Sequence, residues 1–210
     1  MFKHCSDTNS INSDSSYSSS SKPSAFFKFH SRDGVKTDKN HIYFYTEVDR
    51  ETIRELGEAI RETETYCVNM KREMNLKKLP IYLHINSDGG SIFAAFNAID
   101  FMNSCRVPIY SIIEGSAASA GTLISVCAKK RFIRPNAHML IHQLSSECWG
   151  KMNEIEDSYI NLKALMRRIR QVYSEHTSIP KTELKKLLKR DIWLNSDECI
   201  ENGLVDGLWE

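Results

Sequence analysis

Short apolar runs and longer amphipathic stretches alternate along the chain from residue 41 onward. Runs that are rich in β-branched and aromatic residues and bounded by turn residues predict strands; these runs cover residues 41–48, 80–87 and 107–115. The third run is continuously apolar, which is typical of a strand buried on both faces of a parallel sheet. Short strands around a Pro–Asn turn are expected within residues 130–143.

Apolar residues at helical spacing predict helices between and after these strands. The first helix follows Asp49, a residue type that caps helix N-termini, and its apolar positions are Ile53, Leu56, Ile60 and Val68. Further helices are expected over residues 92–105, up to about Cys127, over 152–176 and over 180–190, before a short helix and strand within 193–209.

The longest predicted helix, residues 152–176, has one apolar face. Its members are Ile155, Tyr159, Leu162, Met166, Ile169 and Tyr173. Strands that alternate with helices in this way predict an α/β fold with a mostly parallel sheet and crossover helices.

The beginning of the chain has a different composition. Residues 6–24 are rich in serine and have almost nothing to bury, so residues 1–24 are expected to form a disordered tail ahead of one domain over residues 25–210. A phosphorylated or partner-binding tail is the alternative. The segment AFFKFH, residues 25–30, is expected either to dock on the domain or a neighbour, or to form a first strand.

Charge and composition exclude several classes of protein. The net charge is +1 with no long basic run, which argues against nucleic acid as the main partner. No apolar run approaches the roughly 20 residues that span a bilayer, and the start lacks the apolar region of a secretory signal, so no membrane association is expected. The six cysteines are scattered without a CxxC pair, which argues against structural zinc and fits a cytoplasmic or equivalent reducing compartment.

The stretch GSAASAGTL, residues 115–123, consists almost entirely of small residues. It is either a tight crossing of a helix and a strand or a turn that presents a reactive serine to a substrate. Three residues bear on the second interpretation. Taken singly, Ser119 is a packing residue, His142 at the end of MLIHQ is more often structural than catalytic, and Asp191 in KRDIWL is a helix-terminal or surface carboxylate.

Four segments that follow one another along the chain favour the reactive-serine interpretation. They are YLHINSDGGSIFAAFNAIDFM, EGSAASAGTLI, AHMLIHQ and RDIWLNSDECIENGLVD. Together they resemble the proteolytic subunit of the Clp ATP-dependent protease, a family of serine peptidases, over about residues 41–208. The resemblance implies a crotonase-like α/β fold of repeated β-α-β units with a protruding handle helix. It implies a Ser119–His142–Asp191 catalytic triad, and neither a cofactor nor a metal.

The resemblance also assigns roles to the segments around the triad. It implies that the backbone N–H groups of Gly90 and Ala120 form the oxyanion hole, a donor pair whose loss typically costs about 3–4 kcal/mol per donor. An unfolded polypeptide substrate would lie as an added strand against Gly89, Ser91 and Ile92 on one side and the stretch that begins with Gln143 and Leu144 on the other.

Partners follow from the same resemblance. The helix over residues 152–176 corresponds to the family's handle, which interdigitates between two heptameric rings in a tetradecamer. Because the chain contains no P-loop, ATP use is expected in a separate AAA+ ATPase that feeds the chamber.

The chain departs from the family's usual pattern in several places. Asp88 stands where the glycine turn usually has proline, and a turn-capping role is expected for it. Leu144, Ser145 and Ser146 replace the usual Pro and glycines after the histidine, and Lys189 replaces an acidic residue next to Arg190 at the ring–ring contact. The beginning of the chain also does not match the family's axial hairpin. We therefore expect weakened ring stacking.

Two other functions compete with a peptidase. A crotonase-fold acyl-CoA enzyme would share the fold and the oxyanion site but would not need a serine triad. A ring subunit that is catalytically inactive would keep the fold without the chemistry. Covalent labelling of Ser119 by a fluorophosphonate or β-lactone probe discriminates the peptidase from the inactive subunit.

Overall fold

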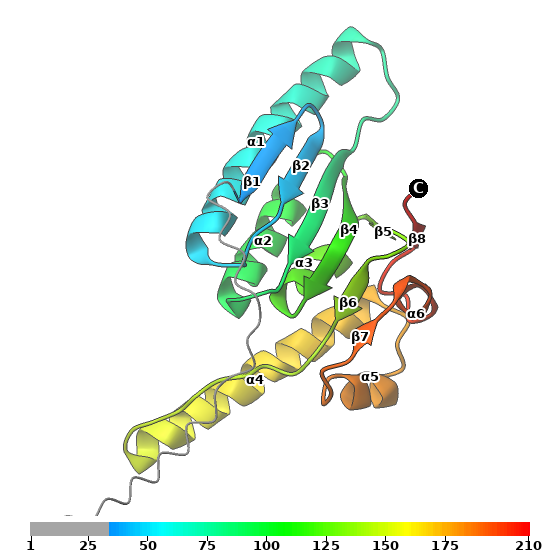
Figure 1. Cartoon of the computed structure of the whole chain (residues 1–210). Coiled ribbons are helices and arrows are strands. Elements are labelled where there is room, and N and C mark those ends of the chain that lie inside the picture. Colours follow the sequence, from blue (N-terminus) through cyan, green and yellow to red (C-terminus); the bar gives the residue numbers. More distant parts are fainter. Residues whose placement is uncertain (1–33) are drawn as a thin grey trace, which may run out of the picture. The chain divides into compact units, whose positions relative to one another are not determined.

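The computed structural model describes residues 34–210, so the predicted Ser-rich tail and the AFFKFH segment lie outside the described residues. One sheet organises this part of the chain (Figure 1). Its strands are β1 (Val35–Asp38), β2 (His41–Phe44), β3 (Ile81–Ser87), β4 (Ile109–Ala118), β5 (Lys130–Ile133), β6 (His138–Leu140), β7 (Trp193–Leu194) and β8 (Gly207–Leu208). The helices are α1 (Arg50–Glu73), α2 (Ile92–Ser104), α3 (Ala120–Val126), α4 (Met152–His176), α5 (Lys181–Leu187) and α6 (Ser196–Glu201).

The sheet is mostly parallel, which confirms the predicted class of fold. Its strand order is β1-β2-β3-β4-β5-β8, and β6 pairs with the far end of β4. The pairs from β2 to β8 along this order are parallel, as is β4 with β6, whereas β1 with β2 and β6 with β7 are antiparallel. Parallel neighbours require crossover connections, and α1, α2 and α3 supply them.

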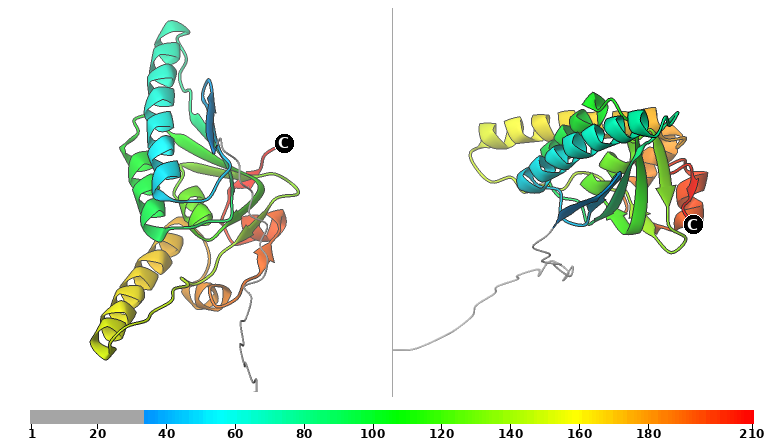
Figure 2. Two further views of the ribbon diagram at one scale, coloured as in Figure 1. Left: turned by 60° about the vertical axis from the view of Figure 1, so that its left-hand side comes forward. Right: turned by 90° about the horizontal axis from the view of Figure 1, so that it is seen from above.

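Helices α1, α2 and α3 cover one face of the sheet (Figure 2). The first, α1, begins where the sequence predicts: the Asp49 carboxylate accepts from the Thr52 N–H at 2.8 Å, and the Thr52 hydroxyl lies 3.1 Å from the Asp49 N–H. This reciprocal cap satisfies two amides that a helix start leaves without partners. Of the helices within residues 34–210, none combines the length and the apolar character needed to cross a membrane.

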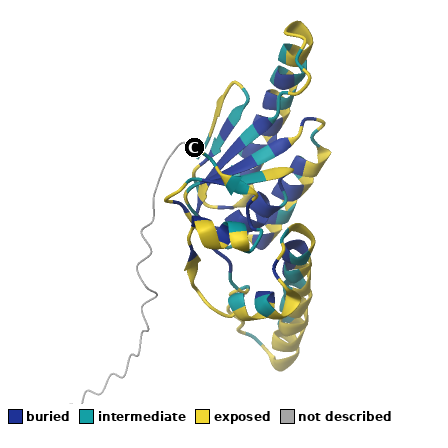
Figure 3. Ribbon diagram, turned by 90° about the vertical axis from the view of Figure 1, so that its right-hand side faces the viewer, coloured by how far each residue is buried: buried dark blue, intermediate teal, exposed yellow. Residues whose placement is uncertain are grey.

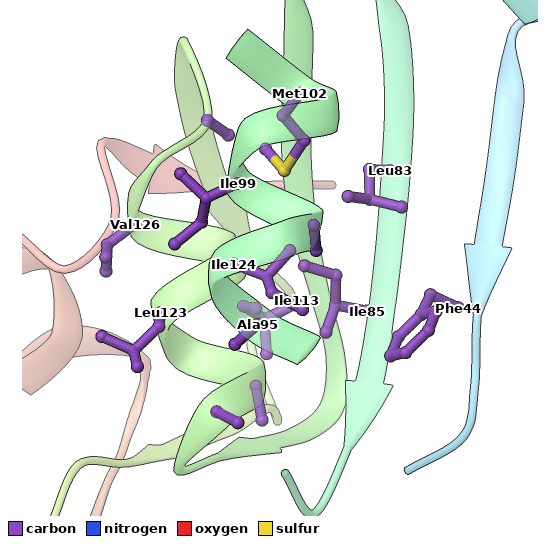
Figure 4. Packing of buried hydrophobic residues seen from close by; sticks show 14 of the residues in the cluster. Phe44, Leu83, Ile85, Ala95, Ile99, Met102, Ile113, Leu123, Ile124 and Val126 are labelled. Atoms are coloured by element: carbon purple, nitrogen blue, oxygen red, sulfur yellow. The ribbon is translucent and has the colours of Figure 1, made fainter. Parts of the chain in front are cut away.

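The hydrophobic core lies between these helices and the sheet (Figure 4). Leu83, Ile85 and Ile113 from β3 and β4 are fully buried there. In β2 the burial alternates, with Ile42 and Phe44 in the core and His41 and Tyr43 half-buried on the other face. The alternation shows that only one face of this strand is fully covered.

The boundaries of α4 agree with the prediction, but its apolar face does not lie in the core. Only Ile169, Val172 and Tyr173 are buried, whereas Tyr159 is 60% exposed. Figure 3 shows the N-terminal half of the helix in the exposed colour. The reason is geometric: only the C-terminal part of α4 packs beside α3, and the rest extends past the edge of the domain.

Three other predicted boundaries need correction. The strand expected over 41–48 ends at Phe44, because the chain bends before Val48 forms a single parallel bridge with Gly90. The strand over 107–115 continues to Ala118, because β6 gives its last residues a new partner. The helix over 180–190 ends at Leu187, since the carbonyl of Leu188 instead accepts from the Gln143 N–H at 2.6 Å. The polar edge strand β1 was not predicted.

Arg131 joins the sheet to the last segment of the chain. Its guanidinium pairs with the Asp206 carboxylate and donates to the carbonyl oxygens of His176 and of Gly203, the latter at 2.8 Å. The arginine side chain is 15% exposed. One side chain in β5 therefore links the end of α4, the turn after α6 and the residue before β8.

Candidate active site

Strand pairing brings the glycine turn beside the small-residue stretch. In the parallel pair of β3 and β4, Ser87 lies opposite Ala117. The chain that follows β3 and the chain that follows β4 therefore leave the sheet at the same edge, with Gly89 and Gly90 next to Ser119. The carboxyl ends of parallel strands are where α/β folds build their sites.

Ser119 occupies an unusual backbone conformation at the start of α3. It has φ 52° and ψ −120°, one of three positive φ values among the described residues other than glycine. Its N–H donates to the Leu140 carbonyl at 2.9 Å, which extends the β4–β6 pairing by one residue. Backbone strain of this kind costs about 1–3 kcal/mol and persists where neighbouring structure enforces it.

A second pairing brings His142 to Asp191. The antiparallel register of β6 and β7 sets Leu140 opposite Trp193, and the same register carried two residues further sets His142 opposite Asp191. The His142 Nδ1 lies 3.1 Å from the Asp191 carboxylate. The exposed fraction is 26% for the histidine side chain and 78% for the aspartate side chain. The carboxylate is thus placed to fix the ring but is open to water in the single chain.

Ser119 and His142 line one pocket, together with Gly90, Ala120, Gln143 and Leu144. The serine hydroxyl makes no hydrogen bond within residues 34–210, so the expected contact with His142 is not formed in this structure. Catalytic hydrogen bonds are often loose before substrate binds. The structure thus brings the serine, histidine and aspartate to one place, with one of the two expected hydrogen bonds made.

The two amides expected to form the oxyanion hole have no partner in the described part of the chain. The N–H of Gly90 lies between those of Gly89 and Ser91, which donate to the Ser87 hydroxyl and the Val48 carbonyl. Ala120 is the first residue of α3, where a helical N–H has no intrahelical acceptor. Both amides are therefore available to a ligand atom.

The expected substrate edge is shorter than the sequence suggested. Ser91 caps α2, and Ile92 is already its first helical residue. On the other side, the amide of Gln143 is bonded to Leu188 and that of Leu144 lies 3.1 Å from the Met166 sulfur. The turn-capping role expected for Asp88 is filled instead by the Ser87 hydroxyl, which accepts from the Gly89 N–H at 3.2 Å.

Two further residues lie behind the serine, Thr122 and Tyr173. The sequence pattern predicts no role for Thr122 and only an apolar position for Tyr173. The Tyr173 hydroxyl lies 2.6 Å from the Thr122 hydroxyl, which in turn donates to the Ser119 carbonyl at 2.6 Å. Tyr173 is 1% exposed, and burial is the main cause that raises its pKa above the usual range. One signal was present in the sequence: a tyrosine on a buried helical stripe needs a partner for its hydroxyl.

A serine at a strained turn, a histidine held by a carboxylate and two free amides in one pocket are the parts of a serine hydrolase. Residues 37–210 match the profile of the family described as Clp protease. The chain belongs to the Clp protease family and, by family, to the serine proteases, and its α/β fold is the crotonase-like fold of that family.

Individual relatives agree with this assignment. The chain is 38% identical over 128 residues to ATP-dependent Clp protease proteolytic subunit 2 of Treponema denticola, and this match spans 60% of the chain and 64% of the relative. It is 30% identical over 175 residues to proteolytic subunit 1 of Chlamydia muridarum, spanning 81% of the chain and 86% of the relative. A solved structure of a ClpP1 point mutant from Listeria monocytogenes superposes with a TM-score of 0.70 at 25% identity, covering 82% of this chain and 92% of that one.

Proposed function

We propose that this protein is an endopeptidase that uses Ser119, His142 and Asp191 to hydrolyse peptide bonds of unfolded polypeptides. The observation that carries the proposal is the shared pocket of Ser119 and His142 with the unpaired amides of Gly90 and Ala120 at its rim. An acyl-CoA enzyme of the crotonase type would use the amides but would leave the His142–Asp191 pair without a role.

In the proposed reaction, each atom of the site has a task. Because Nδ1 of His142 faces Asp191, it carries the proton of the neutral ring, and Nε2 is left to act as the base. Nε2 takes the Ser119 proton as Oγ attacks the carbonyl carbon, and the resulting oxyanion is held by the two free amides. The histidine then gives this proton to the leaving amine, and water repeats the sequence to release the acyl group.

The proposal also includes the assembly, the partner and the compartment in which the reaction takes place. The exposed part of α4 offers Met152, Ile155, Tyr159 and Ile160 to another subunit, in keeping with heptameric rings that stack through a handle. A separate AAA+ ATPase would supply unfolded chains.

Five cysteines of the described residues are free thiols, in keeping with a cytoplasmic or equivalent reducing compartment.

The experiment is covalent labelling with a fluorophosphonate combined with hydrolysis of an unfolded protein and of a peptide. Ser119→Ala and His142→Ala are each expected to lower peptide turnover by about 10⁴-fold or more, because the triad acts as one unit. Ser116→Ala is the matched control, since Ser116 lies in the same stretch but on β4 before the turn.

Each alternative gives a distinct result. An assembled protein that is neither labelled nor active is an inactive ring subunit. Acyl-CoA turnover that survives Ser119→Ala identifies a crotonase-type enzyme. Loss of activity in Ser116→Ala but not in Ser119→Ala means that the nucleophile is wrongly assigned.

A further inference from the structure

The carbonyl group of Ser119 is held differently from the carbonyl groups at the starts of α1 and α2. There, the carbonyl of the capping residue accepts from the N–H four residues further on, which belongs to Ile53 at 3.1 Å and to Ala95 at 3.0 Å. The Ser119 carbonyl instead accepts from the N–H of Thr122, three residues further on, at 3.1 Å, and from the Thr122 hydroxyl at 2.6 Å. Two groups of one residue therefore hold this carbonyl.

A buried tyrosine extends this contact into a chain of hydroxyl groups. Because the Thr122 hydroxyl donates to the Ser119 carbonyl, the Tyr173 hydroxyl, 2.6 Å away, is the donor to Thr122. Both side chains are fully buried. Burial raises the pKa of Tyr173, so its hydroxyl keeps its proton at neutral pH and remains a donor. The chain thus runs from α4 through α3 to the backbone of Ser119.

This carbonyl shares a planar peptide group with the N–H of Ala120, and the two point in opposite directions across it. A hydrogen bond that fixes the carbonyl therefore also fixes the direction of the N–H. Under the proposed function, the Ala120 N–H is one of the two donors to the oxyanion, and such donors act only when they are aimed at that atom. A carbonyl that accepts hydrogen bonds also polarises its amide and strengthens the N–H as a donor.

The backbone of Ser119 needs such support. Its ψ of −120° sets the orientation of the peptide group that follows, and it occurs together with a positive φ of 52°. A strained conformation of this kind persists only where neighbouring groups enforce it. The bonds from Thr122 act directly on the peptide group in question.

We propose that Thr122 and Tyr173 are positioning residues that aim the Ala120 N–H at the oxyanion of the proposed reaction. This inference rests on the proposed peptidase function of the same site. The two hydroxyl groups act through the backbone and not through contact with the reacting atoms. Because the Tyr173 side chain also lines the pocket, its test removes the hydroxyl and keeps the ring.

The main test is Thr122→Val, which keeps the shape of the side chain but removes the hydroxyl. We expect kcat for a fluorogenic peptide to fall by about tenfold with KM little changed, since a misdirected donor loses part of the roughly 10²- to 10³-fold that a whole donor contributes. A peptide boronate, whose adduct with Ser119 imitates the oxyanion, should lose affinity by a similar factor. Thr122→Ser keeps a hydroxyl and is expected to restore the rate.

Ser125→Ala is the matched control for a merely structural effect. Ser125 lies on the same helix and is also fully buried, and its hydroxyl lies 3.1 Å from the Ser111 hydroxyl and makes no contact with Ser119. This variant is expected to melt at a lower temperature but to keep the kcat and the boronate affinity of the wild type. All rates are expressed per site that a fluorophosphonate labels at completion, so that loss of folded protein does not count.

Tyr173→Phe tests the outer member of the chain and decides the matter if Thr122→Val does not fold. It is expected to lower kcat, but by less than Thr122→Val, since Thr122 still reaches the carbonyl. The double variant with Thr122→Val should be no slower than Thr122→Val alone, because the Tyr173 hydroxyl acts only through Thr122.

The outcomes separate this inference from the function on which it rests. Wild-type kcat and boronate affinity in Thr122→Val, or wild-type kcat in Tyr173→Phe, overturn the inference and leave the peptidase intact. An equal fall of kcat in Ser125→Ala, or a Thr122→Ser variant as slow as Thr122→Val, overturns it too. A wild type that cleaves no peptide and takes no label overturns both.

Discussion

Gly89 lies against Ser119, the proposed nucleophile, at a distance that only glycine allows. A Cβ atom built on Gly89 would lie 2.7 Å from the Ser119 Cβ and 2.8 Å from the Ala118 carbonyl oxygen. The backbone there also has φ +95°, a region that L-residues rarely adopt. The glycine turn and the serine turn are therefore packed directly on one another.

Gly89→Ala is expected to destabilise the fold by about 1–3 kcal/mol and to lower peptidase activity by more than the loss of folded protein explains. The reason is that the displaced turn carries the Gly90 amide away from Ser119. Denaturant unfolding and peptide turnover measure the two effects. Gly207→Ala is the control, because a Cβ at Gly207 meets nothing within 4 Å. Equal behaviour of the two variants would refute the close approach.

At the scale of residues, motifs in a fixed order predict Ser119, His142 and Asp191 as a triad, and the structure brings Ser119 and His142 to one pocket with Asp191 at hydrogen-bond distance from His142. The sequence was insufficient for Tyr173 and Thr122, which are 51 residues apart in the chain. Their contact depends on how α4 crosses α3, and a residue pattern within one helix contains no information on that crossing. The exposure of Asp191 agrees with what KRDIWL alone predicts, a carboxylate at the surface.

At the scale of elements, α4 shows where a periodic pattern misleads. An apolar stripe predicts that one face of a helix is buried, but it does not show which element or subunit covers that face. The C-terminal part of the stripe is covered by this chain, whereas Tyr159 and Ile160 remain exposed. The boundaries of the helix were predictable from the sequence because they depend on local capping and spacing.

Arg131 controls how the end of α4 and the last strand attach to the sheet. Burial alone would raise the pKa of Asp206, but hydrogen bonds from the Arg131 side chain and backbone outweigh it and lower that pKa. A lowered carboxylate pKa stabilises the fold above the unfolded value of about 3.9, and this stabilisation is lost as the pH falls through the folded pKa.

Asp206→Asn is therefore expected to lower the melting temperature at pH 7, and the difference from the wild type should shrink below about pH 4. Melting curves from pH 3 to pH 7 measure both. Asp100→Asn, an exposed carboxylate on α2, is the control and should change little. A difference from wild type that stays constant with pH would mean that the ion pair contributes nothing through its charge.

At the scale of the whole molecule, the exposure of Asp191 bears on both the proposed activity and the proposed assembly. The acid of a serine triad is ordinarily buried, where it orients the histidine, yet Asp191, the proposed acid, is 78% exposed in the single chain. Arg190 and Lys189, which precede it directly, are exposed as well. A neighbouring subunit that covers this segment would shelter the acid and hold it in place.

Lys189→Asp is expected to raise both the fraction of double rings and the rate of peptide cleavage. An aspartate there removes a like charge beside Arg190 and puts an opposite charge in its place. Light scattering gives the mass, and a fluorogenic peptide gives the rate. Lys185→Asp makes the same charge change on α5 and serves as the control. Single rings of wild type that cleave peptides at full rate would contradict the coupling.

The positive φ of Ser119 lowers the thermal stability of the protein at a position that the proposed activity requires. Any side chain at this position pays the steric cost of positive φ, and glycine alone avoids it. Ser119→Gly should therefore melt at a higher temperature than Ser119→Ala, although both lack the nucleophile, and comparing the two isolates the backbone cost. Selection for thermal stability alone would favour glycine here, whereas the proposed peptidase requires the serine hydroxyl, so under this proposal the strain is retained for the sake of turnover.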